Sequence, residues 1–97
     1  MTAYFVTRHS GALDWARAQG IDATPLSHLD PASIAPGDTV IGSLPVHIAA
    51  EVTARGARYL HLSLDLPAGA RGRELTAEEM VRYGARLTEY RIKEADP

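Results

Sequence analysis

Hydrophobic and polar positions divide the chain into short strands and amphipathic helices. Residues 3–7 form a short run of apolar, β-branched and aromatic side chains, which is typical of a buried strand. Apolar residues then recur at helical spacing over residues 12–16, and Gly20 fits the position just after a helix end. Ser10 is expected to cap this helix. The first predicted unit is therefore a strand, a turn and a helix.

A second unit of the same kind follows a stretch that is punctuated by prolines. Residues 21–37 carry three prolines, so we expect at most a short edge strand there, around residues 26–29. Residues 39–42 predict a second buried strand. Three residues are expected to delimit the helix that follows, namely Ser43 as its cap, Pro45 in its first turn and Gly56 at its end.

The last third of the chain predicts one more strand and one more helix. Residues 58–66 alternate leucines on one face with polar side chains on the other, as a half-covered strand does. After a loop, Thr76 and Glu79 form a capping box for a helix. We expect residues 96 and 97 to fray. The inward face of this last helix is predicted to carry Met80, Val81, Gly84 and Leu87.

This order of elements predicts a single α/β domain over residues 1–97. It would be a small Rossmann-like fold with a mostly parallel sheet of about four strands and three helices. A chain of 97 residues buries only about 60–65% of its unfolded surface, which makes self-association an attractive source of stability. Gly84, inside the predicted helix, costs about 1 kcal/mol unless another backbone packs against it, and a dimer contact would supply one.

Composition narrows the classes of partner. The net charge of −2 gives no long-range field to collect duplex DNA or an anionic membrane. The sequence has no cysteine, which excludes disulfides and thiolate metal or redox chemistry. The N-terminal residues lack the apolar run of a signal peptide or a membrane span, so we expect a cytoplasmic protein.

The two strand-to-helix junctions are the candidate site. If their strands are adjacent, both junctions flank one crevice, where helix N-termini favour an anion such as phosphate. Arg8 would supply a fixed cation and His9 a proton-transfer group, and the alternative is a solvated turn. Arg71 and Arg73 could close over a bound phosphate as a lid. The remaining expected ligand-binding residues are Thr7, Ser10, Gly11, Gly42, Ser43, Leu44, Pro45 and Asp65.

No metal site or other cofactor is predicted. His61 and Asp65 are suitable ligands by type, but four residues along a strand separate their Cα atoms by roughly 13 Å. His47 and Glu51 lie one helical turn apart, and such pairs are more often exposed contacts than ligands.

Four segments that together span most of the chain are distinctive: YFVTRHSGALDWA, DPASIAPGDTVIGSLPVHIAAE, ARGARYLHLSLDLP and RGRELTAEEM. Through them, nearly the whole chain resembles a small family of CRISPR-associated proteins from type III systems. That family is similar to a minimal CRISPR-associated Rossmann fold and is linked to ring-nuclease activity. The resemblance implies a homodimer that binds cyclic oligoadenylate, above all cyclic tetraadenylate, and linearises it to end antiviral signalling.

The implied reaction is a metal-independent phosphodiesterase step. A ribose 2′-hydroxyl would attack the adjacent phosphorus, giving a 2′,3′-cyclic phosphate and a free 5′-hydroxyl. Arg8 and His9 are the residues that we expect to serve it. Two alternatives stay open at this point: a non-catalytic sensor or sponge for cyclic oligoadenylate, and a structural subunit that uses the polar face of His61, Ser63 and Asp65 as an interface.

Overall fold

Five strands form one sheet in the order β2-β1-β3-β4-β5 in a computed structural model that describes residues 1–96. Strands β1 to β4 run parallel and β5 pairs antiparallel with β4. The α/β class and the mostly parallel sheet are therefore as predicted, with one strand more than expected. The strand bounds are β1 Ala3–Val6, β2 Thr24–Leu26, β3 Thr39–Gly42, β4 Arg58–Ser63 and β5 Arg86–Tyr90.

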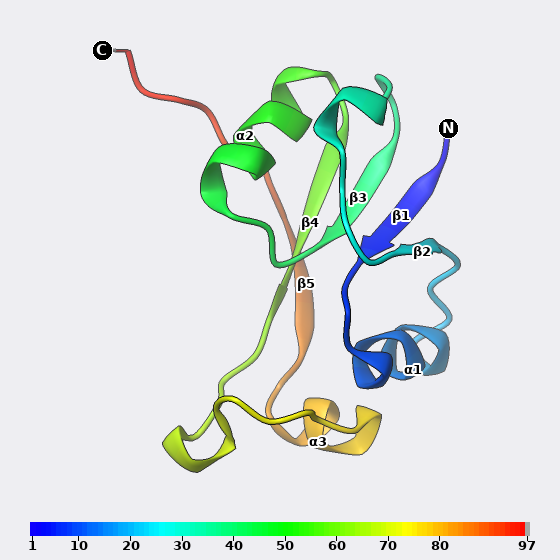
Figure 1. Ribbon diagram of the computed structural model, residues 1–97, viewed down its shortest axis with the longest axis vertical. Coiled ribbons are helices and arrows are strands. Elements are labelled where there is room, and N and C mark those ends of the chain that lie inside the picture. The colour runs from blue at the N-terminus through cyan, green and yellow to red at the C-terminus, as the bar shows by residue number, and fades with distance from the viewer. Residues whose placement is uncertain (97) are drawn as a thin grey trace.

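Helices cover both faces of the sheet. Figure 1 shows α2 at one end of the view and α1 and α3 at the other. One buried cluster contains Val40, Val52 and Tyr59 and lies between the sheet and α2, and the other contains Phe5 and Trp15 and lies between the sheet and α1. The helix bounds are α1 Ser10–Ala18, α2 Val46–Ala54 and α3 Ala77–Arg82, with 3₁₀ turns η1 Pro31–Ser33 and η2 Ala68–Ala70.

The two strand–helix units lie where the hydrophobic pattern predicts them, but their helix starts differ. His9, not Ser10, is the N-cap of α1, and Pro45, not Ser43, is the N-cap of α2. Neither start has a side-chain cap, so both predicted serine caps are wrong. The Ser43 hydroxyl instead donates to the carbonyl of Leu62 in β4, a partner that local sequence does not reveal.

The end of the chain departs most from the prediction. Helix α3 stops at Arg82, and Gly84 has a φ of 73°, so it cannot lie mid-helix. The Gly84 and Ala85 N–H groups donate to the carbonyls of Val81 and Met80, which is the paired bonding of a glycine-ended helix. The conformation of Gly84 thus explains it without a dimer contact. Val81 is exposed rather than inward, and Leu87 lies on β5.

The predicted edge strand also shifts by a few residues. Strand β2 is Thr24–Leu26 rather than residues 26–29, and Pro25 sits at its centre. This position tolerates proline because β2 is an outer strand that pairs only with β1. Strand β4 is shorter than predicted, ending at Ser63. Within residues 1–96, none of the helices has the length and apolar character needed to cross a bilayer.

Candidate functional site

The order in which the chain adds strands to the sheet reverses between β1 and β3. These strands are parallel neighbours, with Val6 opposite Gly42. From β1 the chain passes through α1 to β2 on one side, and from β3 it passes through α2 to β4 on the other side. Such a topological switch point is where open α/β sheets hold ligands, beyond the carboxyl ends of the strands. The two predicted junctions therefore lie side by side, as the sequence pattern required.

A cavity of about 520 Å³ opens at this point, on the face of the sheet that α1 and α3 cover. Its floor is apolar and its rim carries cations and an imidazole. The apolar lining includes Phe5, Ala12, Leu62, Leu64, Leu66 and Met80. The rest of the lining brings together six residues that were predicted for the site: Thr7, Arg8, His9, Gly42, Ser43 and Arg73.

His9 is paired with a carboxylate that the sequence analysis missed. His9 Nδ1 lies 2.7 Å from Glu74 Oε1, and both side chains are about two-thirds exposed. A carboxylate at Nδ1 fixes the tautomer and the orientation of an imidazole and leaves Nε2 to exchange protons. Glu74 is 65 positions away in the chain, so no local spacing could have linked the two residues.

Arg8 is the cation at the rim that is least committed to other groups. Its one recorded hydrogen bond within residues 1–96 is a long one of 3.4 Å, from Nε to the carbonyl of Ser27. No carboxylate in that part of the chain forms an ion pair with it. Its two terminal guanidinium nitrogens thus remain available for bidentate contact with a phosphate.

Arg73 also lines the cavity, but it has a structural partner. Its Nη2 lies 2.7 Å from Glu79 Oε2, while Glu79 Oε1 accepts from the backbone N–H of Thr76. The predicted capping box of Thr76 and Glu79 is confirmed. The ion pair therefore joins the loop before α3 to this capping box. Arg73 can face a ligand only by sharing or releasing Glu79.

Replacing Glu79 by glutamine should make the stability of the protein less sensitive to acid. The Arg73 guanidinium and the N–H of Thr76 lower the pKa of Glu79 from 4.5 to about 2. Because the pKa is lower in the folded state, this carboxylate stabilises the fold above about pH 4.5, and the stabilisation is lost as the pH falls toward 2. Glutamine preserves the capping box. The difference in melting temperature between wild type and variant should shrink from pH 7 to pH 3, and an unchanged difference would contradict this.

Fewer backbone donors reach the cavity than the sequence suggests. The N–H of His9 donates to Thr7 Oγ1, and the N–H of Leu44 donates to the hydroxyl of Tyr59. Leu44 faces a different hollow, on the α2 side of the sheet. Leu44 was expected among the ligand-binding residues of this crevice, but the hydroxyl of buried Tyr59 already accepts its N–H and it does not line the cavity.

Other predicted ligand residues lie beside the cavity or away from it. Ser10 and Gly11 line an adjoining hollow of about 350 Å³, which shares Arg8 with the cavity and also includes Glu74. Three further predicted residues line neither the cavity nor this adjoining hollow, namely Pro45, Asp65 and Arg71. Asp65 instead forms an ion pair with Arg86, at 3.2 Å.

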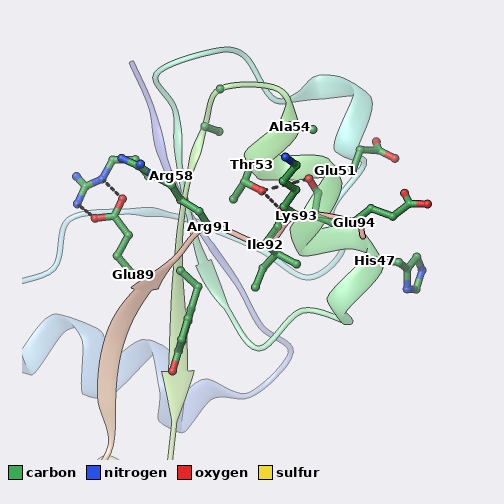
Figure 2. Close-up of a pocket in the computed structure, with 14 residues that line it drawn as sticks. His47, Glu51, Thr53, Ala54, Arg58, Glu89, Arg91, Ile92, Lys93 and Glu94 are labelled. Carbon is green, nitrogen blue, oxygen red and sulfur yellow. Dashed lines mark hydrogen bonds and ion pairs between the residues drawn. The ribbon is translucent and has the colours of Figure 1, made fainter. Parts of the chain in front are cut away.

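A larger hollow lies elsewhere, between α2 and the segment that follows β5 (Figure 2). Its volume is about 830 Å³, and the Thr53 hydroxyl donates to the carbonyl of Ile92 at 2.6 Å, which holds that segment against α2. Its lining carries as many carboxylates as lysines and arginines, and Arg58 and Glu89 are paired with each other. This hollow is larger than the cavity at the switch point, but its charges balance, whereas the cavity is lined by two arginines and no carboxylate. The cavity is therefore the better candidate for an anionic ligand.

Residues 1–96 contain no cluster of side chains arranged to bind a metal ion. The structure brings no group of three or more histidine, aspartate or glutamate side chains together in that range. The imidazole and guanidinium groups of the cavity, with the carboxylate of Glu74 beside His9, are instead groups that acid–base and electrostatic catalysis use.

Fold and cavity together define a small α/β protein whose topological switch point holds a cavity lined by two arginines and a histidine. Residues 4–93 match the family model described as "Putative CRISPR-associated protein (Cas_VVA1548)", so the chain belongs to this CRISPR-associated family. No curated protein and no solved structure matches the chain.

Proposed function

We propose that this protein binds a cyclic oligoadenylate, above all cyclic tetraadenylate, and opens the ring as a metal-independent ring nuclease of type III CRISPR defence. The observation that carries the proposal is the convergence of Arg8 and His9 on one cavity at the carboxyl ends of β1 and β3, with Glu74 of the adjoining hollow paired to His9. Membership of a CRISPR-associated family and the sequence resemblance to ring nucleases support the same activity.

The reaction needs no water and no redox partner. The oxygen of a ribose 2′-hydroxyl forms a bond to the adjacent phosphorus, and the bond from phosphorus to the 5′-oxygen breaks. The 2′-hydroxyl loses its proton, and the leaving 5′-oxygen gains one. His9 would move that proton through Nε2, since Nδ1 faces Glu74. Arg8 would stabilise the charge that develops on the phosphoryl oxygens. The products are a linear oligonucleotide with a 2′,3′-cyclic phosphate and a 5′-hydroxyl.

The functional unit in this proposal is a homodimer. A ring of four nucleotides is larger than one cavity of about 520 Å³ can enclose, so two copies would each hold half of it. Two-fold dimers are the commonest assemblies and match a ring that has two-fold symmetry. Light scattering of the purified protein with and without the ring measures this directly.

One assay tests the activity. The purified protein is incubated with labelled cyclic tetraadenylate, with and without a chelator, and the products are separated by chromatography over time. Linear products with a cyclic phosphate end, formed equally with chelator, are expected. If the ring stays bound and uncut, the protein is a sponge for cyclic oligoadenylate and not an enzyme. If the ring is neither bound nor cut, the proposed function is wrong and the structural-subunit alternative stands.

Replacing Arg8 by alanine should lower kcat/KM for ring opening about tenfold or more, because a charge-assisted hydrogen bond to phosphate is lost in both the ground and the transition state. Binding should weaken as well. Arg17→Ala is the matched control, since Arg17 is exposed on α1 and pairs with Asp14 outside the cavity. If the two variants have the same kinetics, Arg8 does not act at the site.

A further inference from the structure

The hollow that Leu44 faces lies on the opposite face of the sheet from the candidate cavity. Its volume is about 300 Å³, close to the lower limit for small-molecule pockets. The Gly42–Leu44 junction separates the two: Gly42 and Ser43 line the candidate cavity, and Leu44 lines this hollow. The side chains that matter below are Tyr59, His61, Ser63 and Tyr90, which come from β4 and β5.

Aromatic rings form one wall of this hollow. The His61 ring stands edge-on between the rings of Tyr59 and Tyr90, with centroid distances of 5.7 Å and 6.0 Å. Tyr59 is fully buried, whereas Tyr90 is 45% exposed, so part of the Tyr90 ring remains open to contact. Val46 borders the hollow and is 69% exposed. A flat apolar ligand could cover both exposed side chains.

Hydrogen bonding holds His61 by one nitrogen and leaves the other for a ligand. His61 Nδ1 lies 2.6 Å from the hydroxyl of Tyr59, which also contacts the carbonyl of Gly42 and the N–H of Leu44. Burial raises the pKa of Tyr59, which keeps its proton in this network. Within residues 1–96, no hydrogen bond is recorded for His61 Nε2 or for the Ser63 hydroxyl. Both groups can donate and accept, as the polar edge of a base requires.

We propose that this hollow is a nucleobase pocket that takes a purine of the bound oligonucleotide, with Tyr90 as the stacking surface and His61 Nε2 and Ser63 as polar contacts. This deepens the proposed function and rests on it. The candidate cavity offers cations and an imidazole, but it is lined by no tyrosine or tryptophan and its phenylalanine, Phe5, is buried, so we place the stacking partner of the base elsewhere. A purine presents more stacking surface than a pyrimidine.

The pocket is tested with adenosine 5′-monophosphate as the probe, by NMR of the histidine and tyrosine rings. Addition of this nucleotide should shift the signals of His61 and Tyr90, whereas ribose 5-phosphate, which has no base, should not. Tyr90→Ala should weaken binding about tenfold or more, since the loss of one stacking contact has an effect of this size. Tyr90→Phe is the matched control and should bind like wild type, because it keeps the ring.

The outcomes separate this pocket from the proposed activity. If the ring nuclease assay fails but adenosine 5′-monophosphate still shifts His61 and Tyr90, the pocket stands and the activity falls. If cyclic tetraadenylate is cut while Tyr90→Ala binds nucleotide as wild type does, the activity stands and the pocket is refuted. Equal shifts with ribose 5-phosphate would also refute it. A change in oligomeric state on Tyr90→Ala, with nucleotide binding intact, would make this face a protein interface instead.

Discussion

Replacing His9 by alanine should slow the opening of cyclic tetraadenylate about a hundredfold or more, because positioned proton transfer contributes at least that factor. Binding of the ring should change little, since Arg8 and the cavity walls remain. Single-turnover cleavage and equilibrium binding, measured on the same preparation, separate the two effects. A large loss of cleavage with little loss of binding is the result that a proton-transfer role requires.

Two further variants make this result specific. His28→Ala is the control for histidine loss, since His28 is exposed in the segment after β2 and lines none of the hollows described above. Glu74→Gln keeps a hydrogen-bond acceptor near His9 Nδ1 but removes the charge, so it should reduce cleavage less than His9→Ala does. If His9→Ala cleaves as fast as His28→Ala, His9 is not the proton-transfer group.

The centre of the fold could be predicted because its signals are local. Buried strands β1 and β3 are short apolar runs, and each is followed by a helix that ends at a glycine. Gly20 and Gly56 have positive φ values of 75° and 84°, which only glycine adopts without strain. Each unit lies within one contiguous stretch, residues 3–20 and residues 39–56, so local patterns alone could predict both.

The C-terminal part was mispredicted because a helical spacing of apolar residues and glycine continues past the end of α3. Met80, Gly84 and Leu87 are spaced as on a helix face, yet Gly84 ends α3 in the same way that Gly20 and Gly56 end the other helices. In each case the next residue donates its N–H back into the helix. The glycine signal was thus available, whereas β5 lacks an alternating pattern, since Leu87 alone among residues 86–90 is partly buried.

The site was only half predictable, for a physical reason. Arg8 and His9 follow a strand directly, so strand polarity places them at the correct edge of the sheet. Glu74 reaches His9 through the loop before α3, and that loop is positioned by tertiary packing rather than by any local pattern. The hydroxyl of Tyr59 likewise accepts a hydrogen bond from the N–H of Leu44, 15 positions away, which no local pattern reveals.

Gly11→Ala should destabilise the protein by about 3 kcal/mol, although alanine normally favours a helix. A Cβ built on Gly11 would lie 1.8 Å from the carbonyl oxygen of Leu75, which is backbone and cannot rotate away. A domain of this size should then melt roughly 10–20 °C lower. Gly69→Ala is the matched control, because nothing lies within 4 Å of the Cβ there, and its melting temperature should stay close to that of wild type.

The same contact connects the fold to the chemistry. Gly11 follows His9 by two residues, and Leu75 follows Glu74 directly, so the close approach of Gly11 to Leu75 also sets the distance between His9 and Glu74. Below its melting temperature, Gly11→Ala should therefore cleave cyclic tetraadenylate more slowly than Gly69→Ala does. If Gly11→Ala melts early but cleaves at the wild-type rate while folded, the His9–Glu74 geometry does not limit the reaction.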